Sequence, residues 1–313
     1  MAYGETKAGT SGSYSQSGMQ GSGKIRKISG NRGIFAGGNL PPGNTDTIDY
    51  ITIGTLADAQ DFGELTSIRN APAGVSNGSR GVFGGGDISS PSDVIDYITF
   101  GTFGNAQDFG ERTEAKGSVA GCPDGSRGLF GGGGPITDTI DYITIASVGN
   151  ATDFGNMLVA TNQLSGLSGG SRGLFCGGTD GSTTVDTIEY VVIGTLGDSA
   201  DFGELTLDKN HRAATSDGSR GLVAGGFTPA TDNIDYITIG TLSDGIDFGN
   251  LSAARAYFSA TSDGSRGIFG GGSNAAHTKL DIIEYVQISS TGNAVDFAEL
   301  SETRNSLQAT SGD

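Results

Sequence analysis

The feature that most constrains this chain is a unit of about 47 residues that occurs six times. The motif Gly-Ser-Arg-Gly appears five times and Gly-Asn-Arg-Gly once, with the arginines at Arg32, Arg80, Arg127, Arg172, Arg220 and Arg266. Successive arginines are 48, 47, 45, 48 and 46 residues apart. Such a period predicts a repeat architecture, in which each unit buries its apolar face against its neighbours.

Each unit contains four short segments with the character of β-strands. Examples are the small-residue stretch 257–262, the apolar stretch 266–272, the alternating segment 46–53 and the Asp-Phe-Gly segment 59–65. Turns rich in Asp, Asn and Gly separate these segments, which is typical of hairpins, and no long stretch has helical periodicity. Four antiparallel strands per unit, repeated six times, predict an all-β, six-bladed β-propeller.

The units differ in length at one place only. Between the double glycine and the next repeated Asp lie 7, 6, 4, 7, 5 and 8 residues, and the rest of each full period is 41 residues. The sequence therefore predicts a constant scaffold, with one variable loop per blade between its second and third strands.

The same count predicts how the ring closes. The chain ends at Asp313, before a seventh arginine would be reached, so the segment 305–313 matches a first strand with no partner after it. Unit one begins at its second strand, near Arg32. We therefore predict a propeller over 30–313 whose first blade is completed by 305–313, because a ring must hide its edges. The charged segment 24–29 is the rival for that position, and residues 1–29 are expected to form a flexible extension.

Composition and charge exclude several classes of protein. Gly accounts for 56 of 313 residues without a Gly-X-Y period, so the chain is not collagen-like. The formal net charge of −17 argues against nucleic acid as a partner. No apolar run is long enough to insert into a membrane, and the N-terminal residues lack the apolar core of a classical secretory signal. Cys122 and Cys176 lie at non-equivalent places in the repeat, which favours two free thiols.

Motifs that accompany catalysis elsewhere have structural interpretations here. Asp-Phe-Gly occurs five times, always in the fourth segment and without the other parts of a kinase, so its Phe is predicted to pack between blades. His211 and His277 lie in different contexts, which argues against a copper site, and no D-x-D-x-D-G calcium loop is present. We predict no catalytic residue, no metal and no cofactor.

The repeated arginine of each unit has two interpretations. It could bind an acidic ligand, or it could tie neighbouring blades together by pairing with the acidic residue that recurs in every third strand. We favour the tie, because a partly buried guanidinium needs a carboxylate partner.

The units resemble kelch repeats. In the sixth unit the double glycine 271–272 is followed by Glu284 and Tyr285, then by the aromatic Phe297 and the basic Arg304. Phe stands where kelch repeats have Trp, and it lies farther from the Tyr, so the chain is kelch-like rather than a kelch protein proper. The units are also similar to repeats of virion structural proteins in tailed phages, particularly marine ones. That resemblance implies a fibre, spike or decoration protein on the surface of the virion.

The variable loops indicate where a partner would bind. In an up-and-down blade these loops share one face with the segments that join blades, opposite the uniform turns, and loops on a rigid scaffold often carry binding residues. The candidate ligand-binding residues are Asn39, Asn44, Asp87, Ser89, Asp180, Thr183, Phe227, Thr228, Asn274 and His277, with the basic residues Arg69, Lys116, Lys209 and Arg255. The alternative is neutral variation in solvated loops.

Together with the resemblance, these patterns predict a non-enzymatic phage surface protein that attaches to a host-surface glycan or protein. One alternative is a purely structural decoration protein of the capsid or tail without receptor binding. The other is a carbohydrate-active propeller enzyme, which would need acidic, His or metal-ligand positions that break the repeat, and few exist. Residues 1–29 are expected to contact other virion proteins, and formation of a homo-oligomer stays open.

Overall fold

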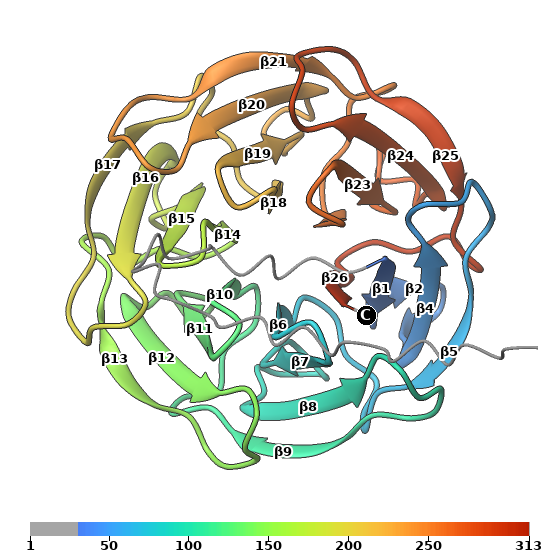
Figure 1. The fold of residues 1–313 in the computed structure, drawn as a ribbon, viewed down its shortest axis with the longest axis horizontal. Helices are drawn as coiled ribbons and strands as arrows, with labels where there is room; N and C mark the ends of the chain where they lie inside the picture. The colour runs from blue at the N-terminus through green and yellow to red at the C-terminus, as the bar shows by residue number, and fades with distance from the viewer. Residues whose placement is uncertain (1–30, 313) are drawn as a thin grey trace, which may run out of the picture.

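The computed structural model describes residues 31–312, which form a six-bladed β-propeller (Figure 1). Each blade is an antiparallel sheet of four strands, so the predicted fold is confirmed. The predicted extension 1–29 and the rival strand 24–29 lie outside the described residues.

The strands occupy four concentric positions around the axis (Figure 1). The inner strands, from blade 1 to blade 6, are β26 (Gln308–Gly312), β6 (Ala73–Ser76), β10 (Ala120–Pro123), β14 (Ser165–Ser168), β18 (Ala213–Ser216) and β22 (Ser259–Ser262). The second strands are β1 (Arg32–Ala36), β7 (Arg80–Gly84), β11 (Arg127–Gly131), β15 (Arg172–Thr179), β19 (Arg220–Ala224) and β23 (Arg266–Gly270). The third strands are β4 (Thr47–Thr52), β8 (Val94–Thr99), β12 (Thr139–Thr144), β16 (Thr184–Val192), β20 (Asn233–Thr238) and β24 (Ile282–Gln287). The outer strands are β5 (Gln60–Glu64), β9 (Gln107–Glu111), β13 (Thr152–Asn156), β17 (Ala200–Glu204), β21 (Ile246–Asn250) and β25 (Val295–Glu299). The short pair β2 (Asn39–Leu40) and β3 (Gly43–Asn44) lies within the variable loop of blade 1.

The first blade is assembled from both ends of the described chain. Strand β26 pairs with β1 in antiparallel register, with Gly312 opposite Arg32 and Thr310 opposite Ile34. The other three strands of this blade follow one another from Arg32 onward. Hydrogen bonds between the two ends therefore close the ring.

The hydrophobic core lies between blades rather than inside them. At the first junction, Ile34, Ile48 and Phe62 of blade 1 pack with Phe83 and Ile98 of blade 2. All five side chains are at most 2% exposed. The other junctions have equivalent clusters, because each flat blade buries its faces only against its two neighbours.

The glycines that follow the second-strand aromatic residues make room for the next blade. A Cβ on Gly131 would lie 2.5 Å from Cε1 of Phe175. In blade 4 the equivalent of this glycine is the larger Cys176. In blade 5 the equivalent of Phe175 is Val223, which is smaller than Phe and lies in the same core cluster as Cys176. At the junction between blades 4 and 5, a larger residue on one side is therefore matched by a smaller one on the other, as a close-packed core requires.

The glycine of Asp-Phe-Gly has a similar role at the outer strands. Gly110 has a φ of +144°, and a Cβ there would lie 2.6 Å from the carbonyl oxygen of Gly149 in the next blade. The exception is Ala298 of blade 6. The preceding Phe109 is 2% exposed in the core between blades, which explains the motif without catalysis.

The repeated arginine does tie neighbouring blades, but the predicted carboxylate partner was wrong. Arg80 of blade 2 donates from Nη1 to the carbonyl oxygen of Ile145 in blade 3, at 2.9 Å, and its guanidinium lies 4.2 Å from the ring centroid of Tyr97. Arg127 makes the same bond to Ile193 of blade 4, at 3.0 Å. Other arginines and backbone N–H groups pair with the third-strand carboxylates instead.

Candidate functional site

The two ends of the blades form two different faces. The turn face carries the uniform turns between first and second strands and between third and outer strands. The loop face carries the variable loops 39–45, 87–92, 134–137, 179–185, 227–231 and 273–280, together with the segments that join each outer strand to the next inner strand. Loops and joining segments meet through isolated bridges such as Asn70 with Asp87 and Asn210 with Phe227.

Buried ion pairs anchor the joining segments beneath the loop face. Arg69, which lies between blades 1 and 2, donates from Nη2 to Oδ2 of Asp96 on β8 at 2.7 Å. Thr66 of the same segment donates its hydroxyl to Asp96 as well. Arg255 pairs in the same way with Glu284 at 2.5 Å. Both arginines are at most 1% exposed, so the prediction that their side chains lie on the binding surface is corrected.

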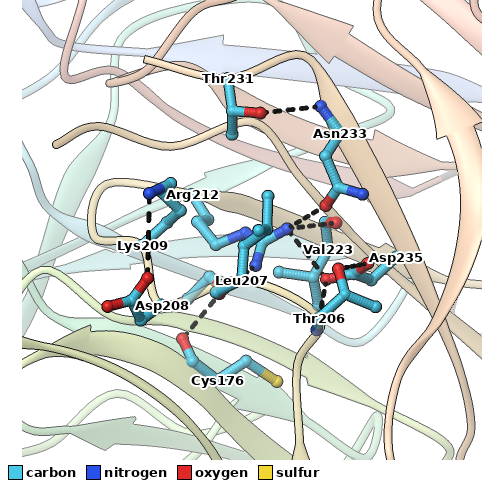
Figure 2. Close-up of polar contacts among 11 residues, drawn as sticks. Cys176, Thr206, Leu207, Asp208, Lys209, Arg212, Val223, Thr231, Asn233 and Asp235 are labelled. Carbon is cyan, nitrogen blue, oxygen red and sulfur yellow. Dashed lines mark hydrogen bonds and ion pairs between the residues drawn. The ribbon is translucent and has the colours of Figure 1, made fainter. Parts of the chain in front are cut away.

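In two units a lysine occupies the position equivalent to Arg69. A nearby arginine then supplies the guanidinium that pairs with the third-strand carboxylate. Arg212, three residues after Lys209, donates to Asp235 at 3.1 Å and also to Asn233 and the carbonyl of Val223. Figure 2 shows this guanidinium among its acceptors, while Lys209 lies beside Asp208. Arg112, four residues before Lys116, pairs with Asp141 at 3.2 Å.

The two lysines support loops instead. Nζ of Lys116 donates to the carbonyl of Pro135 at 3.0 Å, and Nζ of Lys209 donates to the carbonyl of Thr228 at 3.1 Å. Both side chains are therefore already engaged with the variable loop of the blade that follows.

Blade 4 holds its carboxylate without a guanidinium. Thr161 takes the position of Arg69 there. Glu189 accepts hydrogen bonds from the backbone N–H groups of Leu158 and Val159 and from the hydroxyl of Ser199. The joining segment is thus fixed at every junction, with five cationic anchors and one neutral anchor among the described residues.

At the axis, the six joining segments form a closed ring of backbone hydrogen bonds. One residue from each segment has a positive φ between 50° and 61°, and its N–H donates to the carbonyl of the equivalent residue in the preceding segment, at 2.6 to 3.2 Å. The six residues are Ala71, Ser118, Gln163, His211, Tyr257 and Ser306. All six have a Cβ atom and five have side chains larger than a methyl group, although this left-handed conformation disfavours any side chain.

A cavity of about 70 Å³ opens at this ring. The residues that line it include Ser118, Gln163, His211, Tyr257 and Ser306. Arg212 is the one charged residue among the described residues that line it, and Asp235 neutralises its guanidinium. The mouth of the axis is therefore polar but close to neutral.

Four aromatic rings extend from this cavity across blades 5 and 6. The rings of His211 and Tyr257 have centroids 3.9 Å apart, Tyr257 and Phe227 are 5.6 Å apart, and Phe227 and His277 are 5.2 Å apart. We call these four residues the aromatic cluster. His277 is exposed, and the other three are half-buried. Two predicted binding residues, Phe227 and His277, are thus brought together with two that were not predicted as binding residues.

Burial makes His211 a neutral group. Desolvation lowers its pKa to about 3, so the imidazole is uncharged at neutral pH. Burial also raises the pKa of the Tyr257 hydroxyl, which therefore stays protonated. His211 and Tyr257 can therefore accept or donate hydrogen bonds without carrying charge.

The remaining predicted residues lie on the loop face, and several shape its loops. The side chain of Asn44 joins the loops of blades 1 and 2, since it accepts from Asn39 and donates to the carbonyl of Asp87. Asp180 accepts from the N–H groups of Ser182 and Thr183, and these bonds lower its pKa. Asn274 accepts from two N–H groups in its own loop, while Ser89, Thr183 and Thr228 are exposed.

Sequence reasoning missed His211, Tyr257 and Gln163 as site residues, and it missed Arg112 and Arg212 as anchors. The signal for the first three was a break in the repeat, because the ring positions hold Ala, Ser, Gln, His, Tyr and Ser in order. Only the fold shows that these six positions surround one axis.

No known family model matches the chain, and no curated protein matches it in sequence. Among residues 31–312, no helix is long and apolar enough to cross a membrane. Within the same residues, no group of three or more His, Cys, Asp or Glu side chains is arranged to hold a metal ion.

Proposed function

We propose that this chain is a non-enzymatic binding propeller on the surface of a tailed-phage virion, with the loop face as its contact surface. The observation that carries the proposal is the contrast between faces. On the turn face the arginine ties recur from blade to blade and one exposed aromatic residue, Phe103, packs against Tyr50 and Phe62. The loop face concentrates the four rings of the aromatic cluster in blades 5 and 6. Clustered, partly exposed aromatic residues are typical of binding surfaces.

The positions of the chain ends support this orientation. Arg32 and Gly312 pair at the end of blade 1 that lies on the turn face, opposite the variable loops. The N-terminal end of the described residues therefore lies on the turn face. An attachment through residues 1–29 to other virion proteins would leave the loop face directed outward.

The turn face also offers a surface for assembly. Five exposed apolar side chains occupy equivalent positions in its third-to-outer turns, each between 53% and 58% exposed: Leu56, Phe103, Val148, Leu196 and Leu242. Exposed apolar groups in a regular ring favour protein contacts. This ring favours the second candidate, a decoration protein whose only contacts are with its own particle.

Blocking one face at a time tests the two candidates. Ala275→Cys places a thiol on the loop of blade 6, and Ser219→Cys places one on a turn of blade 5; both sites are exposed. The native Cys122 and Cys176 are buried and free, and burial raises the pKa of Cys176 to about 12, so a maleimide reagent labels the new thiols.

The measurement is adsorption of the fluorescent full-length protein to a panel of intact bacterial cells. We expect a bulky polyethylene glycol at position 275 to abolish adsorption and the same group at position 219 to leave it unchanged. Adsorption that is insensitive to the group at position 275, or absent for every strain, would favour the decoration protein.

A further inference from the structure

The aromatic cluster is not required by the fold. The equivalents of His211 and Tyr257 in other segments are as small as Ala71 and Ser306, and the same ring hydrogen bonds form there. The equivalents of Phe227 are Asn39, Asp87, Gly134, Thr179 and Ser273. Packing between blades therefore explains none of the four rings, in contrast to the Tyr and Phe pairs that recur in every blade.

Backbone strain is concentrated at the same place. Outside the six-residue ring, the described residues contain two non-glycine residues with positive φ, Thr228 at 75° and His277 at 59°. Both lie on the two variable loops that carry Phe227 and His277 of the aromatic cluster. Tyr257 itself has a φ of 61°, a conformation that costs a bulky side chain free energy. Strain held by the surrounding structure is a frequent mark of a functional site.

The chemistry of the cavity beside the cluster selects a class of ligand. Ser118, Gln163 and Ser306 supply neutral hydrogen-bonding groups, and His211 is uncharged. No carboxylate lines the cavity among the described residues, so a cation has no partner there. The net charge of −17 repels an anion. A neutral ligand with hydroxyl groups on its rim and an apolar face meets these conditions.

Sugar rings have this combination, because one face of a pyranose presents C–H groups while its edge presents hydroxyls. Resting on the proposed function, we propose that the loop face binds a neutral saccharide residue, stacked on Tyr257 and Phe227. One small substituent of the sugar, such as a hydroxymethyl or acetamido group, enters the axial cavity. A volume of about 70 Å³ holds several waters but not a whole sugar ring.

The test uses the full-length fluorescent protein on an array of neutral and sialylated glycans. Neutral hexose or N-acetylhexosamine termini are expected to retain it, and sialylated termini are not. Saturation-transfer NMR with glucose, galactose, mannose and N-acetylglucosamine then identifies the sugar protons that contact the protein.

Two variants and one control locate the binding. Tyr257→Asn keeps a residue that tolerates positive φ, and we expect it to weaken glycan affinity about tenfold or more, as loss of a central aromatic contact does. Phe227→Ala is expected to weaken it less. Phe103→Ala removes an exposed aromatic ring on the opposite face and should leave affinity unchanged. Thermal melting checks that all three variants are folded.

Each outcome bears on the inference separately from the proposed function. Absence of glycan binding, or binding that survives Tyr257→Asn and Phe227→Ala, overturns the saccharide site. If blocking position 275 still abolishes cell adsorption in that case, the loop face is a contact surface for another class of molecule. If glycans bind and the Tyr257 variant loses them, the saccharide site is supported.

Discussion

The turn face and the loop face are made from the same six units, yet they use their residues differently. On the turn face, arginines such as Arg80 each donate to a carbonyl of the next blade, and one solution recurs around the ring. On the loop face, the anchor beneath the surface varies from Arg69 to Arg212 to the neutral set around Glu189. The loop side therefore tolerates changes of the anchoring side chain, because both the ring of backbone hydrogen bonds and the buried carboxylates hold the joining segments in place.

Removing the closing strand should have the largest effect. Deletion of residues 305–313 takes away β26, its pairing with β1, and the buried Leu307 and Ala309. We expect a loss of about 5 kcal/mol or more, comparable with the whole stability of a typical domain. Calorimetry or circular dichroism should show a much lower melting temperature, or no cooperative transition.

The control for this deletion lies on the loop face. Residues 180–183 are exposed and connect the paired residues Thr179 and Thr184, so an Asn-Gly turn can replace them. This variant should melt close to the parent chain. Equal melting temperatures for the parent and the chain without 305–313 would show that β26 does not close the ring.

Breaking a cationic anchor should have the next largest effect. Arg69→Met leaves the buried carboxylate of Asp96 without its guanidinium, and removal of one partner of a buried pair costs about 3–5 kcal/mol. Thr161→Ala at the equivalent position of the neutral anchor should cost about 1 kcal/mol or less. Urea unfolding measures both free energies, and similar values for the two variants would mean that the ion pairs add nothing to the junctions.

The smallest expected effect is the loss of stability at acidic pH that comes from His211 beside the axial cavity. The pKa of His211 is about 3 in the folded chain and near 6.5 in an unfolded one, so between these values the unfolded state takes up a proton that the folded state refuses. Lowering the pH from 7 to 4 should therefore remove at most about 3 kcal/mol of stability through this residue.

His211→Gln should abolish that part of the acid sensitivity. Gln is compatible with the ring, because Gln163 occupies an equivalent position with a φ of 56°. His277→Gln changes an exposed side chain and serves as the control. If the unfolding free energies of the parent and the His211 variant fall in parallel from pH 7 to pH 4, the imidazole is not held neutral by the fold.

The fold could be predicted because its determinants repeat. The constant spacing and the strand patterns identify blades, and the single variable gap identifies the loop between β-strands two and three in each unit. Sizes that compensate across a junction, such as Cys176 with Val223, could not be recognised, since the facing residues lie about one unit apart in the sequence.

The candidate site was less predictable because its residues lie close together in the fold but share no sequence motif. Arg69 was predicted on the surface since a basic residue near a loop is equally compatible with solvent and with a buried carboxylate, and only the position of Asp96 decides between them. His211 and Tyr257 come from different units and have nothing in common with Ala71 or Ser306 except a backbone conformation. The residue types at these six positions do not indicate the positive φ that they share.

The pairing of Gly312 with Arg32 has a consequence for the order of the chain. The two ends of the described residues are direct neighbours, so a short peptide could join them, and the chain could be reopened within a loop of another blade without changing any strand pair. Such a circular permutant would keep every junction and would move only the seam. A linear sequence here encodes a circular object, in which the blade that comes first is arbitrary.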